Sequence, residues 1–497
     1  MDPQERTRAE RQHQIGGRVF LWLMFLGLPL VLNRGYFDIT ETKTVFFVIC
    51  TGLYLCFRLV MALQYGGVPA GIDASEGFIL ALFLLSLLSS GLSGFFRDSF
   101  LGPQGRWQGA GMLGLYALLF AAVRRRGWRE EDVMAPLLAG QTLTAALAIV
   151  NHLGADPLGL MEKLMVSDRG RYISTLGNIN FAGAYFTLTL GAATVWLLLA
   201  EDRGKRLRLA LLTLPGLWAA MAARSESALL GLGAVLALLP LLLRAHPAAL
   251  RRWPWLLPGI AVGMQLYALL CRAEGAYLSV LTRALLHPAM SLSLALTGAL
   301  LGLALRKKEE AALRRFAKCY AAALAILLGL AALTLVLLNT RWRDLPLGSG
   351  EDWLRFSGAW GTDRGKIWAR CIAYYKEYTP VQKLLGGGCG RLARLDSQQR
   401  LFPDAILDAA HCEYLQLLLN WGALGLLSWL GWLFVSLRSA FRRGEAVSLA
   451  MGAAALAYAL QALVNIAQAP SICLFVLMLS LSASNGNKNR ENEAFHH

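Results

Sequence analysis

Apolar runs long enough to form membrane-spanning helices recur along almost the whole chain, separated by short polar segments. An α-helix needs roughly 20 apolar residues to cross the ~30 Å hydrocarbon core of a bilayer. About fourteen runs of this kind begin near Val19, Thr44, Gly77, Ala110, Met134, Ile179, Leu207, Ala228, Trp255, Ser291, Phe316, Glu413, Ala446 and Ser471. The pattern predicts an all-α polytopic membrane protein with about 12–14 transmembrane helices.

One hydrophilic stretch, residues 339–410, is the only one large enough to form a subdomain, and we expect it to be a large extracytoplasmic loop. Residues 1–338 before it would form the earlier transmembrane helices, and residues 411–484 after it the C-terminal ones. The polar residues 485–497 are expected to be a disordered cytoplasmic tail.

Composition agrees with a membrane protein, since 56% of the 497 residues are hydrophobic and only 16% are charged. The net charge of +16 would suggest nucleic-acid binding in a soluble protein, but no arginine-aromatic nucleic-acid module is present. Positive residues instead gather in alternate loops, which is the positive-inside pattern. It predicts cytoplasmic termini and outward segments at 36–43, 95–109, 154–178, 223–226 and 339–410. No small-residue cleavage site follows the first apolar run, so we expect it to be a retained first helix and not a signal peptide.

An amphipathic helix is expected inside the long hydrophilic stretch, on the membrane surface or on the bundle. Thr362 or Asp363 can cap its start, and Thr379-Pro380 ends it. Lys366 and Arg370 lie on the polar side. Apolar residues repeat at helical spacing on the other side: Ile367, Trp368, Cys371, Ile372 and Tyr375.

Two arginines are candidates for binding an anion. Arg224 lies in a very short turn between two apolar helices, where an ionisable side chain is costly and often lines a site. A guanidinium fork suits diphosphate oxygens, although Arg224 could equally snorkel to the surface or pair with Glu226. Arg364 opens the amphipathic helix, so free backbone N–H groups would add to its charge, unless it is simply a solvated surface residue.

His411 is the candidate for proton transfer, because imidazole titrates near neutral pH and His411 immediately precedes an apolar helix. Glu413 and Asp408 are alternative bases or groups that orient the imidazole. No second histidine stands at ligand spacing, so no metal site is predicted. The eight cysteines include no Cys-x-x-Cys pair, and a structural disulfide would need two cysteines exposed on one side, such as Cys371 and Cys389.

Three further stretches are rich in turn-forming or polar residues. Residues 386–390 (Gly-Gly-Gly-Cys-Gly) lack the Gly-Lys-Ser/Thr of a phosphate-binding loop, and predict a tight turn where backbone approaches backbone or a phosphate. Arg106 lies in Phe-Leu-Gly-Pro-Gln-Gly-Arg-Trp-Gln-Gly, in an expected outward loop. Asn178 and Asn180 begin another span with polar groups at its outer end.

Taken together, these stretches resemble the O-antigen ligase/polymerase superfamily of bacterial envelope glycosyltransferases, from about Phe95 onward. Residues 100–109 look like its outward loop before an early helix. Residues 176–183 look like its "LGNPNxxAG" segment, with Ile179 in place of proline, and Ala223-Arg224-Ser225 resembles its "SR" turn. Residues 364–368, 385–390 and 411–415 with Gly422 resemble its outer-loop signature "R…W…GxGxG…H-N-x-x-L…G", with Cys412 after the histidine.

The resemblance implies a GT-C-like, cofactor-free, metal-independent inverting glycosyltransferase in the bacterial cytoplasmic membrane. It would take a glycan from an undecaprenyl diphosphate carrier on the outer face and place it on a hydroxyl of a lipid, glycan or protein acceptor. By this likeness Arg224 and Arg364 would hold the diphosphate, and His411 would activate the hydroxyl. Further substrate contacts are expected from Arg106, Asn178, Asn180, Trp368, Glu413 and Tyr414.

The sequence leaves open whether such an enzyme is a ligase, a polymerase or a protein O-oligosaccharyltransferase. A transporter or flippase of lipid-linked sugars is the alternative from another class. Transporters often carry inverted repeats and ionisable groups at the membrane midplane. No such repeat is apparent here, and the charge is concentrated in one outer loop.

Overall fold

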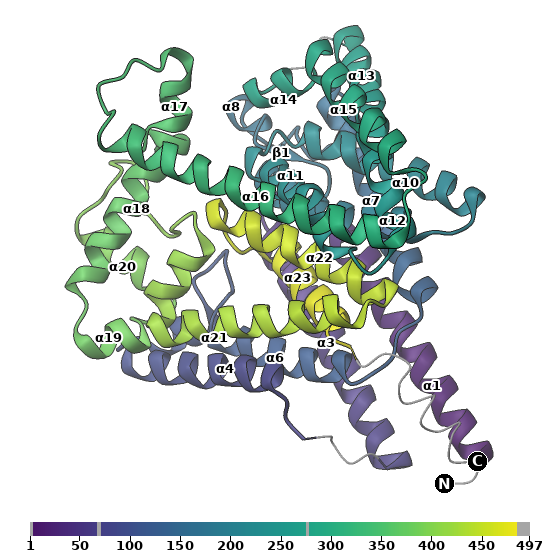
Figure 1. The fold of residues 1–497 in the computed structure, drawn as a ribbon. Coiled ribbons are helices and arrows are strands. Elements are labelled where there is room, and N and C mark those ends of the chain that lie inside the picture. Colours follow the sequence, from purple (N-terminus) through teal and green to yellow (C-terminus); the bar gives the residue numbers. More distant parts are fainter. Residues whose placement is uncertain (1–2, 67–70, 275–277, 485–497) are drawn as a thin grey trace.

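The computed structural model describes residues 3–66, 71–274 and 278–484, which are helical almost throughout (Figure 1). Within these residues, nine helices are long and apolar enough to cross a membrane, so the chain is a multi-pass membrane protein. These nine are Ile39–Tyr65 (α3), Ala74–Leu92 (α4), Glu130–His152 (α7), Ile179–Leu199 (α9), Pro247–Ala273 (α12 with α13), Pro288–Leu305 (α15), Glu310–Asn339 (α16), Glu413–Arg443 (α21) and Ala446–Val464 (α22 with a 3₁₀ turn).

All fourteen predicted apolar runs lie in helices. Three of them form shorter apolar helices, Ala110–Arg124 (α6), Glu226–Leu242 (α11) and Ala469–Ser482 (α23). The first run belongs to α1 (Pro3–Trp22), which continues through a π-helical turn (Leu23–Gly27) into α2 (Leu28–Leu30). The remaining elements are α5 (Phe96–Leu101), α8 (Val166–Arg169), β1 (Tyr172–Ile173), β2 (Gly177–Asn178), α10 (Arg203–Ala222), α14 (Val280–Leu285), α17 (Glu351–Leu354), α18 (Trp360–Glu377), α19 (Pro380–Leu385) and α20 (Arg391–Gln398).

The centre of the bundle consists of α9, α22 and α23, whose side chains are almost all buried. Alanine dominates the contact, as in Ala453, Ala454 and Ala455 of α22. Small side chains let helix backbones approach closely, which is the usual basis of packing inside a membrane, where lipid is as apolar as leucine. These three helices therefore form the tightly packed core of the bundle.

α16 is the opposite case, because most of its 30 residues are exposed on the surface of the protein. Its buried residues are Leu313, Ala317 and Leu338, near its two ends. Its hydropathy is the highest of the nine long helices. Beyond Lys318 the helix carries no charge and is largely unburied, so lipid covers most of this part and α16 stands at the edge of the bundle.

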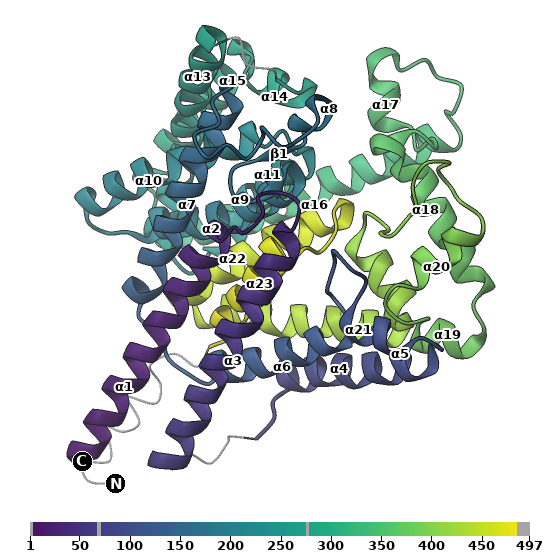
Figure 2. The same cartoon turned by 180° about the vertical axis from the view of Figure 1, so that it is seen from behind.

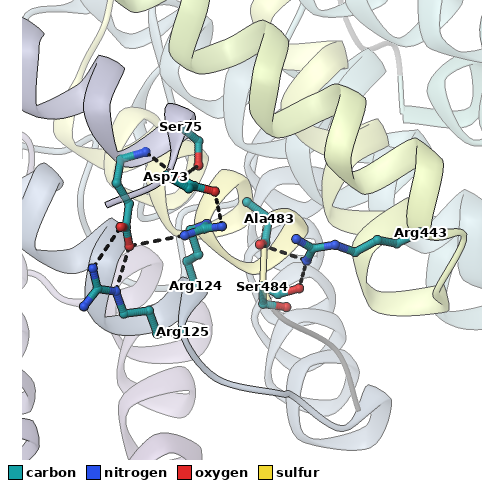
Figure 3. Close-up of polar contacts among 8 residues, drawn as sticks. Asp73, Ser75, Arg124, Arg125, Arg443, Ala483 and Ser484 are labelled. Atoms are coloured by element: carbon teal, nitrogen blue, oxygen red, sulfur yellow. Dashed lines mark hydrogen bonds and ion pairs between the residues drawn. The ribbon is translucent and has the colours of Figure 1, made fainter. Parts of the chain in front are cut away.

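A network of ion pairs joins the start of α4 to the end of α6 (Figure 3). Asp73 caps α4 by accepting a hydrogen bond from the backbone N–H of Glu76 and pairs with Arg124. The Glu76 carboxylate accepts two hydrogen bonds from Arg125, at 2.8 and 2.9 Å, and lies 3.3 Å from Arg124. Arg443 at the end of α21 belongs to the same region, where it donates to the carbonyls that end α23, those of Ala483 and Ser484.

The basic end of α6, with Arg124 and Arg125, therefore lies near Arg443 at the basic end of α21. Figures 1 and 2 show α17, α18, α19 and α20 on the side of the molecule away from the start of α1. The predicted tail, residues 485–497, lies outside the described residues.

The segment between α16 and α21 has a small hydrophobic cluster of its own, in which α18 packs against α20 and the start of α21. α18 ends at Glu377, as Thr379-Pro380 predicts, and its regular turns follow three residues with positive φ, 361–363. It buries Ile367, Cys371 and Tyr374. The predicted apolar face was wrong at Ile372, which is 46% exposed, because the buried stripe runs at positions i, i+4 and i+7 and passes through Tyr374 instead.

Candidate functional site

His411 lies in the turn before α21, where charged groups from distant parts of the chain surround it. Burial lowers the pKa of His411 to about 4, and the positive charges of Arg364 and Arg106 act in the same direction, while Asp408 opposes them. The imidazole is therefore neutral near pH 7 and keeps one ring nitrogen able to accept a proton. Side chains separated by 305 positions, Arg106 and His411, thus act on each other in one small region.

Arg106 and Asp408 form a bidentate ion pair across this region. The guanidinium Nε and Nη2 donate to the two carboxylate oxygens of Asp408 at 2.9 and 2.8 Å. Both residues line a cavity of about 80 Å³ that reaches Glu413 at the start of α21. The pair joins the loop before α6 to the segment that carries His411, so it can fix the position of that segment.

Arg364 begins the regular part of α18 and is half-buried. Its Nη1 donates to the carbonyl of Gly361 at 2.6 Å. Burial lowers the pKa of the Arg364 guanidinium, and the nearby carboxylate of Glu226 acts against this effect. Its Nε is buried and has no hydrogen-bond partner among the described residues. A buried cation of this kind is expected to gain from an anionic ligand.

Arg224 belongs to the turn between α10 and α11, two residues before Glu226. Its Nη2 donates to the carbonyl of Gly170, next to the β1–β2 hairpin. The following residue, Ser225, is buried, and its hydroxyl donates to Asn180 Oδ1 at 3.1 Å. The Arg224 turn is therefore tied to the start of α9, while Glu226 connects it electrostatically to Arg364.

The other predicted contact residues have defined partners within the protein. Asn178 caps α9 by accepting from the Asn180 backbone N–H at 2.9 Å. Trp368 Nε1 donates to the carbonyl of Ala410, immediately before His411, at 3.0 Å. Glu413 is 5% exposed, lines the cavity and accepts a hydrogen bond from Tyr458. Tyr414 donates to the Ala459 carbonyl at 2.6 Å, so its hydroxyl points into the helix packing.

Strained backbone conformations occur at or close to the candidate residues. Non-glycine residues with positive φ are uncommon and cost of order 1–3 kcal/mol when the surroundings impose them. Among the described residues, six have this conformation: Trp107, Ser174, Arg224, Thr362, Asp363 and His411. Each is one of the candidate residues or lies within four positions of one. Strain at such positions is typical of functional sites, where the fold fixes side chains in one direction.

The glycine cluster contacts the backbone of α21, and its Cys389 and Gly390 also line the cavity beside Arg106. The N–H groups of Gly387 and Gly388 donate to the carbonyls of Leu419 and Asn420 in α21, both at 3.0 Å. Cys389 N–H donates to Ser99 Oγ at 2.8 Å. Backbone therefore approaches backbone at this turn, as one of the two expected outcomes has it. Cys371 and Cys389 are both free thiols, in separate hydrophobic clusters.

Sequence reasoning gave too little weight to Glu226 and Asp408, and it missed His152. His152 is the last residue of α7 and lies within the electrostatic reach of Arg224. Its Nε2 is buried and lacks a hydrogen-bond partner among the described residues. The signal that identified His411, a histidine at the end of an apolar run, applies equally to His152 and would have found it.

The side chains that meet here suit an anionic, hydroxyl-bearing ligand. Arg364 and Arg106 supply positive charge, the neutral His411 can accept a proton, and Asp408 supplies acceptors, with Glu413 in the adjoining cavity. Arg224 is related to this group only through its neighbour Glu226, whose carboxylate acts on Arg364. Within the described parts of the chain, no three His, Cys, Asp or Glu side chains are close enough to share a metal ion. A scan against protein-family models found no match to this chain, and a search of curated proteins found no similar sequence.

Proposed function

We propose that the protein is a membrane glycosyltransferase of the O-antigen ligase or polymerase type. It would move a glycan from a polyprenyl diphosphate carrier, undecaprenyl diphosphate in bacteria, to an acceptor hydroxyl. The observation that supports this proposal best is the convergence of Arg364, Arg106 and Asp408 on His411, with the Arg224 turn linked through Glu226. Basic side chains and one neutral base are what such a transfer requires.

The leaving group of this reaction is a lipid diphosphate, whose negative charge develops as the glycosidic bond breaks. Arg364 and Arg224 would stabilise that charge at the membrane surface, where a partly buried site strengthens electrostatic interactions. The acceptor oxygen would attack the anomeric carbon while the bond from that carbon to the diphosphate oxygen breaks. His411 would take the proton of the acceptor hydroxyl and pass it to water.

The location that fits this reaction is the bacterial cytoplasmic membrane, with both termini in the cytoplasm and the site on the outer face. The acceptor would be a lipid, a growing glycan or a protein. Ligase and polymerase differ in the bond they make, so the reducing-end attachment of the product would identify the class. The alternative, transport of a lipid-linked glycan, needs two accessible membrane faces and no broken glycosidic bond.

Turnover in detergent tests the proposal, because micelles present no membrane barrier across which to transport anything. Purified protein mixed with lipid-linked glycans and an envelope extract of its host is expected to release free polyprenyl diphosphate. All members of the proposed class release this product, whatever the acceptor. His411→Ala is expected to release none, since the acceptor proton has no base. If folded wild-type protein leaves the donor intact, the glycosyltransferase proposal is contradicted and transport becomes the better explanation.

The pH dependence of the reaction should differ between the free and the donor-bound enzyme. In the free protein the pKa of His411 is lowered to about 4, so its base form persists until the pH falls to that range. A bound diphosphate would offset the arginine charges and raise this pKa. The acidic limb of kcat should therefore lie at higher pH than that of kcat/KM for the donor. If the acidic limbs of kcat and of kcat/KM fall at the same pH, diphosphate does not bind close to His411.

A further inference from the structure

Residues 340–360, here called the outer hairpin, connect the lipid-exposed helix α16 to α18. Five of their large apolar side chains are exposed: Trp342 (47%), Leu345 (50%), Trp353 (44%), Leu354 (37%) and Phe356 (57%). None of the five belongs to a hydrophobic cluster in the part of the chain that the structure describes. So much exposed aromatic and aliphatic surface in one short segment marks a contact with another phase or another molecule.

The outer hairpin is nevertheless held in a defined conformation by polar contacts. Arg355 donates to the carbonyls of Leu338 at 2.5 Å and of Trp342, and its Nε donates to Glu351 at 2.8 Å. Asn339, the last residue of α16, donates to the Leu354 carbonyl at 2.7 Å and accepts from the Phe356 N–H at 2.7 Å. These contacts fix both arms of the hairpin to the end of α16.

The length of α16 sets the depth of the hairpin in the membrane. The charged residues of α16 all lie near its start, the last of them being Lys318. Residues 319–338 carry no charge, and these 20 residues span about 30 Å of helix, which matches the hydrocarbon core. Leu338 therefore lies at the boundary of the hydrocarbon. Trp342, four residues later, falls at the depth of the lipid headgroups.

We propose that the outer hairpin is a membrane-interface anchor, whose exposed tryptophan and phenylalanine side chains insert among the lipid headgroups at this end of the bundle. Tryptophan prefers this zone because its ring is apolar and its N–H is polar. Lipid is favoured over a protein partner because the hairpin continues directly from a helix that lipid already surrounds. This inference goes beyond the proposed function and does not depend on it.

The anchor is connected to the candidate site by ring contacts. Trp360 Nε1 donates to the Trp353 carbonyl at 3.0 Å, and the Trp360 and Trp368 rings are 5.3 Å apart. Trp368 in turn donates to the carbonyl of Ala410, next to His411. A hairpin seated in the headgroups would thereby hold the start of α18 close to the membrane surface.

Spin labels attached to the hairpin would test its depth in lipid nanodiscs. The parent chain carries Cys56→Ala, Cys319→Ala and Cys412→Ser, which remove the cysteines that are not buried. Single cysteines then replace Trp353 and Phe356. Matched controls are Leu328→Cys, on the lipid-facing middle of α16, and Ser397→Cys, on the exposed surface of α20. Collisions with dissolved oxygen report lipid, and collisions with a water-soluble nickel complex report solvent.

Labels at 353 and 356 are expected to be several-fold less accessible to nickel than the label at 397, and more accessible to oxygen than that label although less than the label at 328. Nickel accessibility equal to that at 397 would place the hairpin in water and overturn the proposal. Shielding from both reagents would also overturn it, because that result indicates a second copy or a protein partner. Two label positions guard against the loss of one variant through misfolding.

Discussion

Arg364→Ala is expected to lower glycan transfer about 10²–10³-fold, as removal of one preorganised electrostatic donor from an active site commonly does. The reason lies in the position of Arg364: it is half-buried, its charge reaches His411, and its Nε lacks a partner among the described residues. If it holds the donor diphosphate, its loss removes stabilisation of the leaving group. The measurement is the rate of polyprenyl diphosphate release by purified protein, normalised to folded protein.

Lys376→Ala is the matched control, since Lys376 lies near the end of the same helix and is exposed. This variant should transfer glycan at the wild-type rate. Arg364→Lys keeps the charge but loses the planar fork, so it should recover only part of the activity. A wild-type rate for Arg364→Ala would remove Arg364 from the site and with it the main support for diphosphate binding.

Gly422→Ala is expected to prevent most of the protein from folding. Gly422 interrupts α21 with φ 67° and ψ −171°, a combination that is essentially restricted to glycine and costs other residues of order 1–3 kcal/mol. A Cβ there would also overlap the Leu384 carbonyl, which cannot move because the adjoining glycine cluster is bonded to α21. The yield of monodisperse protein and its thermal midpoint in detergent measure the effect.

Gly329→Ala provides the comparison, because a Cβ on this α16 residue meets open space. The same substitution is expected to leave stability unchanged or slightly raised, since glycine inside a helix costs about 0.5–1 kcal/mol relative to alanine. Equal thermal midpoints for the two variants would show that the break in α21 tolerates a side chain.

The helices were predictable from the sequence because each apolar run carries its own signal. Segment length and hydropathy do not depend on what a helix packs against, so all fourteen runs lie in helices. Those properties could not distinguish the buried α9 from the lipid-facing α16. Both carry a long run of uncharged, mostly apolar residues, and only the tertiary structure decides which surface is protein and which is lipid.

Single residues of the candidate site were predictable from the sequence, but their contacts with one another were not. His411, Arg364 and Arg224 each stood out by an unusual local context, and the first two interact electrostatically in the structure. The partners of the arginines were not predictable, since Asp408 is 302 positions from Arg106 and Glu226 is 138 positions from Arg364. No periodicity carries information over such separations. Asp408 and Glu226 look like ordinary loop and helix-cap residues until the fold brings them to their partners.

The contrast between α16 and α22 has a consequence for how proteins of this architecture diverge. A residue on α16 is constrained by its solubility in lipid, and many apolar side chains satisfy that condition equally. A residue such as Ala454 in α22 is constrained by volume, because a larger side chain would force two helices apart. Over evolutionary time α16 should drift in identity while keeping its hydropathy, and α22 should keep its alanines. Two apolar helices of the same bundle should thus differ strongly in sequence conservation.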